Sequence, residues 1–135
     1  MPSSNNPPKQ VIILRKDLNM RKGKMVAQGA HASMAAILNE MGVNSNGDRM
    51  LYGNGMTIAM AEWLNGSFTK ICVSVNSEDE LIQVYKEAEA KGLPCALIRD
   101  AGHTEFNGVP TYTAVAIGPA FPHEVDPLTG HLKLL

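Results

Sequence analysis

Two short segments, far apart in the sequence, hold the residues best suited to act on a ligand. The first is Lys22-Gly23-Lys24, followed by Gln28 and His31 at the spacing of successive helical turns. The free N–H groups and the dipole at a helix N-terminus favour an anion, and two lysines beside them add positive charge. The second is the polar run from Asp100 to Thr104. Together the two segments predict a site for an anionic or strongly polar ligand.

Both segments follow predicted strands. Residues 10–15 (QVIILR) form a β-branched run typical of a strand buried on both faces, and a polar loop over 16–23 leads from it. Residues 95–99 (CALIR) form a later strand that ends at Asp100. In α/β sheets, ligands collect where strands end and helices begin. The exits of these two strands are therefore where we expect the site.

A helix over 24–41 is predicted to carry the first segment. It contains no proline and many alanines, and small residues would let it lie close to its neighbours. Its apolar side is formed by Val26, Ala30, Ser33, Met34, Ile37 and Met41. Lys24, Gln28 and His31 group on the opposite side. We expect the first set to face the core and the second to lie away from it.

The remaining elements indicate an α/β fold. Helices are expected over 57–64 and 77–91, the second beginning with a Ser-x-x-Glu capping box, and strands over 69–76 and 112–118. Strands separated by helices favour parallel neighbours, whereas the last two strands lack a helix between them and favour an antiparallel pair. The pattern predicts a mixed four-stranded sheet covered by helices.

Length and composition indicate one globular domain. The chain has 135 residues, which we divide into a flexible tail over 1–8 and a single domain over 9–135, with a Gly- and Asn-rich loop over 42–55. Two cysteines, Cys72 and Cys95, lie in predicted strands and are expected to be buried, reduced thiols. The apolar runs are too short for a membrane span, and the first residues lack the features of a secretory signal. We therefore expect a cytoplasmic protein without a membrane partner.

Charge is distributed unevenly although the net charge is −1. Six of the twelve basic residues fall within sixteen positions, from Lys9 to Lys24, and acidic residues crowd a later segment around Glu78 to Glu89. One end of the molecule is then basic, which permits a polyanionic ligand.

Other catalytic patterns are absent from the sequence. It holds no HExxH pair of metal ligands, no GxSxG nucleophile elbow and no GxxxxGK[ST] phosphate loop. Two simpler interpretations of the candidate residues stay open. Lys22, Lys24, Gln28 and His31 could form a solvated helix start, and Asp100 and Thr104 could serve turn and capping chemistry around Gly102.

The run from Arg15 to Ala32 (RKDLNMRKGKMVAQGAHA) resembles the opening signature of the type II peptidyl-tRNA hydrolases, R-x-D-L-x-M-x-K-G-K-x-A-A-Q-x-x-H-A. Two later stretches agree with the same family. Residues 92–104 are similar to its G-L-x…D-A-G-x-T segment, and residues 116–134 resemble its G-I-G-P and T-G-H-L-K-L ending. The matches span residues 10–135 in the family's order.

The resemblance implies a three-layer α/β/α sandwich around a four-stranded mixed sheet. It also implies hydrolysis of the ester between peptide and tRNA in peptidyl-tRNA, which frees both for reuse in translation, with no metal or organic cofactor. By the same resemblance Lys24, Asp100 and Thr104 form the catalytic group, and the substrate is bound by Lys22, Gln28, His31, His103 and Thr113. How Lys24, Asp100 and Thr104 divide the roles is open.

The sequence departs from the family pattern at three places, and two other functions are compatible with it. His103 stands where the family usually has arginine, Val26 replaces an alanine, and the loop over 42–55 is a probable insertion of about a dozen residues relative to compact members. One alternative is a noncatalytic module that binds RNA or phosphate, and another is an interaction protein that lost the reaction. Retention of Lys24, Asp100 and Thr104 favours the enzyme. The sequence is compatible with a homodimer and does not determine the oligomeric state.

Overall fold

Five strands and four helices make up the part of the chain that the computed structural model describes, residues 6–48 and 56–135. They follow in the order β1 (Lys9–Arg15), α1 (Lys22–Leu38), α2 (Ile58–Asn65), β2 (Lys70–Val75), α3 (Glu78–Ala90), β3 (Cys95–Asp100), β4 (Thr111–Ala120), α4 (Pro122–Thr129) and β5 (Lys133–Leu134). The order up to β4 is the one that the sequence predicts.

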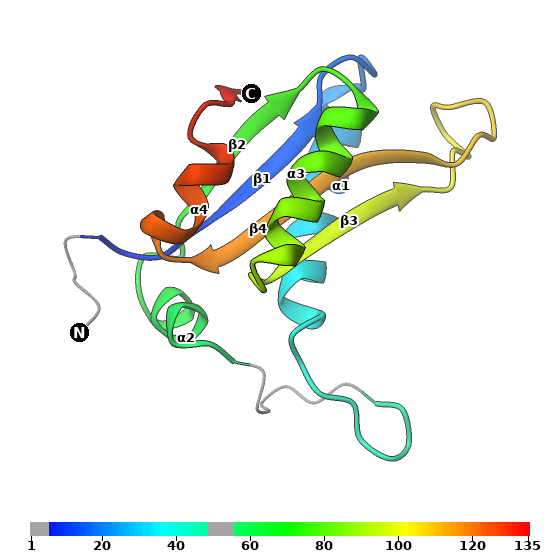
Figure 1. Ribbon diagram of the computed structural model, residues 1–135. Helices are drawn as coiled ribbons and strands as arrows, with labels where there is room; N and C mark the ends of the chain where they lie inside the picture. The colour runs from blue at the N-terminus through cyan, green and yellow to red at the C-terminus, as the bar shows by residue number, and fades with distance from the viewer. Residues whose placement is uncertain (1–5, 49–55) are drawn as a thin grey trace.

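The strands form one mixed sheet in the order β3-β4-β1-β2-β5 (Figure 1). β1 and β2 are parallel, as expected for strands joined through helices. β4 lies between β1 and β3 and is antiparallel to both, which confirms the antiparallel last pair. The predicted count of four strands is one too few. The two-residue β5 adds to the edge beside β2, and it is too short to show a strand period in the sequence.

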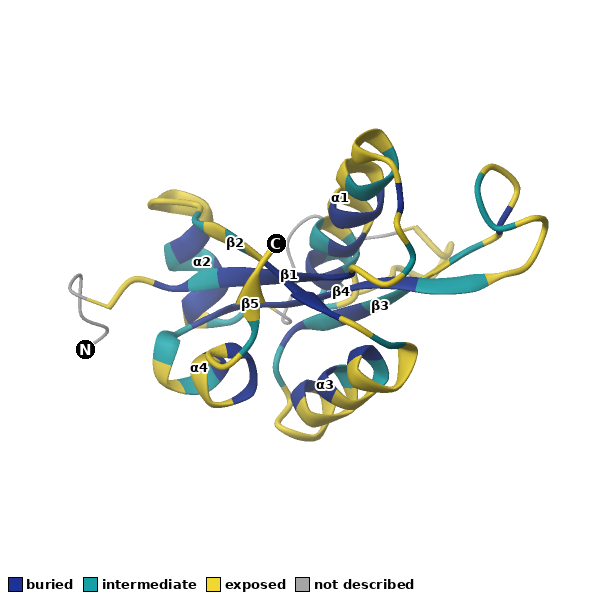
Figure 2. Ribbon diagram, turned by 90° about the horizontal axis from the view of Figure 1, so that it is seen from above, coloured by how far each residue is buried: buried dark blue, intermediate teal, exposed yellow. Residues whose placement is uncertain are grey.

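Helices cover both faces of the sheet, which confirms the predicted α/β/α sandwich. Figure 2 shows α1 and α2 on one face and α3 and α4 on the other. Sequence analysis missed α4, whose interior contains Pro127. Its start nevertheless carried a signal, because Pro122 occupies the first turn and Glu124 Oε1 accepts a hydrogen bond from Phe121 N at 3.0 Å.

The predicted core face of α1 is wrong except toward the end of the helix, where Ile37 is buried as expected. Val26 and Met34 are 72% and 56% exposed, whereas Gln28 is buried with the small residues Gly29 and Ala32. The reason is close packing. A Cβ atom built on Gly29 would lie 3.5 Å from Ile12 Cγ2, so the helix approaches the sheet through its small side chains and turns its larger ones outward.

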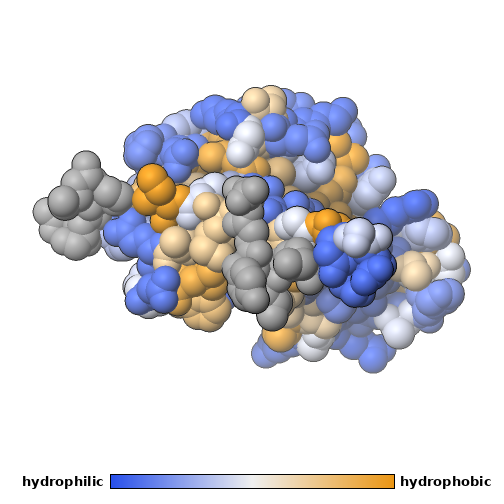
Figure 3. Space-filling view, turned by 90° about the horizontal axis from the view of Figure 1, so that it is seen from below, coloured by the Kyte–Doolittle hydropathy of each residue, from blue (hydrophilic) through white to orange (hydrophobic). Residues whose placement is uncertain are grey.

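α2 covers the end of the same face that is farther from the β3–β4 loop (Figure 1). Its Trp63 is fully buried, and Nε1 donates to the carbonyl oxygen of Thr69 at 2.7 Å. Several apolar side chains of this helix and the turn after it are exposed, including Ile58, Leu64 and Phe68. Figure 3 shows this side of the molecule from below. These exposed apolar side chains and the β3–β4 loop lie at opposite ends of the molecule (Figure 1).

Several smaller sequence predictions can be compared with the described residues. Cys72 is exposed, contrary to prediction, because no helix covers its part of β2, and Cys95 is half-buried; both are free thiols. Burial raises the pKa of Cys95 to about 11. Pro8 is buried against the domain, whereas residues 1–5 of the predicted tail and 49–55 of the predicted insertion lie outside the described residues.

None of the helices within residues 6–48 and 56–135 combines the length and the apolar composition that a membrane crossing requires.

Candidate active site

Lys24 lies in the first turn of α1 and reaches across to the end of β3. Its Nζ donates to Asp100 Oδ1 at 2.9 Å and to Thr104 Oγ1 at 2.8 Å. The side chains of Lys24 and Asp100 are 13% and 14% exposed, so this ion pair is largely shielded from water. The three residues assigned to catalysis by resemblance, up to 80 positions apart in the sequence, thus form one cluster.

The Asp100 carboxylate is held by three donors. Lys24 Nζ and Gln28 Nε2 both donate to Oδ1, the second at 3.2 Å, and the Gly102 backbone N–H donates to Oδ2 at 2.8 Å. The hydrogen bond from Lys24 is the largest cause that lowers the pKa of Asp100, and burial opposes it. The group is therefore ionised at neutral pH and is a weak proton acceptor. This arrangement suits holding the ammonium group in place more than removing a proton from water.

Gln28 and Thr113 support Asp100 from beneath. Thr113 Oγ1 donates a hydrogen bond to Gln28 Oε1, and Gln28 Nε2 donates one to Asp100 Oδ1. Both residues are buried, at 3% and 0% exposure. In the structure the two side chains therefore contact Asp100 and each other, and the prediction that they bind the substrate stays a prediction.

A β-bulge turns Thr113 toward α1. Ile98 pairs with Ala114 and Arg99 with Tyr112, which leaves Thr113 as an extra residue on β4. Beyond the bulge the alternation of faces changes, so Tyr112 packs against the α3 side while Thr113 and Ala114 both face α1. Nothing in the strand's own sequence pattern predicts this bulge.

The β3–β4 loop, residues 101–110, closes around Gly102. Gly102 has φ +85°, and a Cβ atom there would lie 2.2 Å from the carbonyl oxygen of Val109. Its own carbonyl accepts from the Gly108 N–H at 2.8 Å. Because only glycine fits this close approach, the loop folds back and holds Thr104 above Lys24.

The loop also adds contacts that the sequence did not suggest. The Phe106 ring centroid lies 5.6 Å from Lys24 Nζ, within range of a cation–π interaction. Glu105 pairs with Arg21 Nε at 3.6 Å and so ties the loop to the residue before α1. The sequence did carry a signal for Phe106, because it is the one Phe, Tyr or Trp within the polar segment 101–110.

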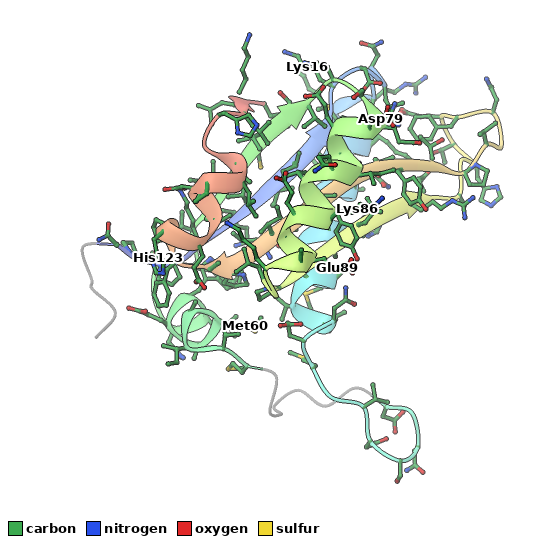
Figure 4. The ribbon with its side chains drawn as sticks, in the orientation of Figure 1. Lys16, Met60, Asp79, Lys86, Glu89 and His123 are labelled. Atoms are coloured by element: carbon green, nitrogen blue, oxygen red, sulfur yellow. The ribbon has the colours of Figure 1, made fainter. Side chains whose placement is uncertain are left out.

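The remaining candidates lie outside the cluster. His31 and His103 are exposed, and in the described part of the chain neither makes a hydrogen bond with the cluster. Lys22 is exposed on the other edge of α1, where it borders a hollow with Met20 and Val26. Lys16, labelled at the upper edge of Figure 4, extends the basic surface along the loop after β1. These cations are suitably placed to meet an extended anion but not to contact one reacting atom.

A metal centre is not evident in the described residues. Within residues 6–48 and 56–135, no group of three or more His, Cys, Asp or Glu side chains is arranged to hold a metal ion. The prediction that no cofactor is used stays a prediction.

The geometry is that of an α/β sandwich with a shielded lysine–aspartate pair at a strand end, bordered by exposed cations. The chain matches the family model described as Peptidyl-tRNA hydrolase PTH2 over residues 8–135. A peptidyl-tRNA hydrolase of Methanocaldococcus jannaschii is 48% identical over 127 residues, which cover 94% of this chain and 99% of the relative. Peptidyl-tRNA hydrolases of Saccharolobus islandicus (42% identical; 94% of this chain, 98% of the relative) and Methanococcus maripaludis (40%; 93% and 97%) are also similar. The chain belongs to the peptidyl-tRNA hydrolase family that this model describes.

Proposed function

We propose that this protein hydrolyses the ester bond between peptide and tRNA in peptidyl-tRNA, releasing free tRNA and peptide. The observation that carries the proposal is the Lys24–Asp100–Thr104 cluster in a chain of this family. The exposed lysines Lys16 and Lys22 near the start of α1, which we call the basic rim, add positive charge. The substrate combines an ester, whose carbonyl oxygen becomes negative during attack by water, with a polyanion that the rim can bind.

Lys24 is the group that acts on the ester. An ammonium group has three N–H donors, of which Asp100 and Thr104 accept two, so within the described residues one remains for a substrate oxygen. Shielding from water strengthens its attraction for a developing oxyanion or for the leaving ribose oxygen. Thr104 Oγ1 accepts from Lys24 and can donate its own proton to the same substrate oxygens or to the attacking water.

Asp100 acts through Lys24 as a positioning residue. It holds the ammonium group in position, and Gln28 and Thr113 hold the carboxylate in position in turn. We assign Lys22, His31 and His103 to the phosphates of the RNA, because all three side chains are exposed and lie outside the cluster, Lys22 on the other edge of α1.

The direct test is cleavage of a tRNA that carries an N-acetylated amino acid. Wild-type protein should release the blocked amino acid, and Lys24→Met, which keeps the length but removes the charge, should lower the single-turnover rate by about 10²- to 10³-fold. Lys86→Met on α3, which removes an exposed charge on the other side of the sheet (Figure 4), is the matched control. Binding of the tRNA without cleavage by wild-type protein would favour the noncatalytic binding module instead.

Two further predictions about the protein stay predictions. A homodimer would show as twice the mass of one chain in sedimentation equilibrium. A cytoplasmic location would show in fractionation of cells that produce the protein.

A further inference from the structure

Phe106 has no role in the folding core. It is half-buried in the β3–β4 loop, and the three clusters of core side chains in the described residues do not include it. An aromatic ring that is kept at the surface of a loop, away from the core, calls for another explanation.

The ring borders the reacting end of Lys24. Its centroid lies 5.6 Å from the Nζ atom that Asp100 and Thr104 hold. A substrate oxygen that accepts a hydrogen bond from Nζ must therefore lie beside this ring. The part of the substrate next to that oxygen is then in position to contact Phe106.

The loop holds the backbone of Phe106 in place before any ligand arrives. Val109 N donates to the carbonyl oxygen of Phe106 at 2.9 Å, and the adjacent Glu105, with a side chain only 18% exposed, pairs with Arg21. Gly108 closes the same turn onto Gly102. Because the backbone is fixed in this way, only the side chain of Phe106 has to be ordered on binding, which lowers the entropic cost of the contact.

We propose that Phe106 is the stacking platform for the adenine of the substrate's 3′-terminal nucleotide. This inference rests on the proposed function, because the ester joins the peptide to the ribose that carries this base. Single-stranded RNA ends are commonly recognised by stacking of unpaired bases on aromatic side chains. The terminal adenosine is shared by all tRNAs while the peptide differs between substrates, so a fixed, flat ring suits the base better than the peptide.

The test compares binding of two RNAs that cannot be cleaved. One is tRNA whose 3′ end carries an N-acetylated amino acid through an amide, and the other is the same molecule without the base of its last nucleotide. Phe106→Leu should weaken binding of the intact RNA about tenfold and leave binding of the abasic RNA unchanged. The matched control is Phe68→Leu, which removes an exposed ring at the opposite end of the molecule and should alter neither affinity.

Equal weakening of both RNAs by Phe106→Leu would overturn the proposal, because the ring would then contact the peptide or only support the loop. No weakening of either RNA would overturn it as well. Phe106→Trp keeps an aromatic face and should bind the intact RNA at least as tightly as wild type, which decides the matter if the leucine variant does not fold. Cleavage of the ester substrate is measured separately, so an inactive wild type would refute the proposed function without changing the base-dependent binding result.

Discussion

The two faces of the sheet are packed by different kinds of side chain. The face under α3 and α4 is filled by branched residues that include Ile13, Val75 and Leu81. The face under α1 is filled mainly by alanines, such as Ala32 and Ala114, with a polar chain of Gln28 and Thr113 beside them.

The difference shows what each face contributes. Large branched side chains bury the most apolar area and so stabilise the fold, by about 25 cal/mol for each Å² removed from water. Small side chains bury less, but they let α1 lie close enough for Lys24 and Gln28 to reach Asp100 on β3. One face therefore mainly supports stability, and the other mainly supports the geometry of the site.

Leu81→Ala, in the core under α3, should cause the largest loss of stability. Leu81 is fully buried, so its truncation should lower the free energy of unfolding by about 2–5 kcal/mol, measured by urea denaturation. The single-turnover rate of the molecules that remain folded should stay at the wild-type value. A rate that falls in parallel with stability would show that this face also positions the site.

Asp100→Asn, on the α1 side, should lower the catalytic rate where Leu81→Ala lowers stability. It keeps the shape but removes the charge that holds Lys24, so turnover should fall on the order of 10²-fold, equivalent to about 2.7 kcal/mol of barrier. Affinity for tRNA should largely survive. Glu89→Gln on α3, which alters a carboxylate that accepts from the Tyr85 hydroxyl at 3.0 Å, is the control (Figure 4). An unchanged rate for Asp100→Asn would remove Asp100 from the mechanism.

The same enlargement of an alanine should act differently on the two faces. Ala32→Leu and Ala88→Leu both overfill a fully buried position, under α1 and α3 respectively, and each should cost about 1–3 kcal/mol of stability. Because Ala32→Leu pushes α1 away from β4, it should also slow single-turnover cleavage by folded protein. Loss of rate in both variants, or in neither, would contradict the division between the faces.

The Lys24–Asp100 ion pair should make the free energy of unfolding depend on pH in the acid range. The pKa of Asp100 is lower in the folded state than in the unfolded chain, so its contribution is present above a pH of about 4 and is lost as the pH falls toward the folded pKa. The difference in unfolding free energy between wild type and Asp100→Asn should therefore shrink below a pH of about 4. A difference that stays constant from pH 7 to pH 3 would mean that the charge of Asp100 does not stabilise the fold.

Lys22→Ala should give the smallest change. Loss of one phosphate contact should reduce the slope of log affinity against log salt concentration by about 1, with little preference among tRNA sequences. Lys86→Ala removes an exposed lysine from the α3 side and should leave the slope unchanged. Equal slopes for wild type and Lys22→Ala would exclude Lys22 from the RNA contact.

Sequence patterns predicted most elements because their signals are local. The strand at residues 10–15 and the capping box at Ser77 depend on neighbouring residues, and both appear in the structure. The strand-exit rule placed the two segments that hold Lys24, Asp100 and Thr104 at one expected site, and the resemblance that spans the chain assigned their catalytic roles.

What escaped prediction depends on tertiary contacts. The buried face of α1 was misassigned because the rule counts large apolar residues, whereas Gly29 and Ala32 make the close contact. The bulge that aims Thr113 exists only through pairing with β3. The contact between Phe106 and Lys24 joins two segments that are far apart in the sequence, so local patterns do not predict it.

The position of Trp63 has a practical consequence for spectroscopy. It is the single tryptophan in the sequence, fully buried beneath α2 and hydrogen-bonded to Thr69, at the end of the molecule away from the β3–β4 loop. Its intrinsic fluorescence should change when α2 leaves the sheet, and it should stay constant when a ligand occupies the site around Lys24 at the other end of the molecule. Tryptophan emission thus gives an optical record of unfolding that can be followed with RNA bound, independently of what happens at the ester.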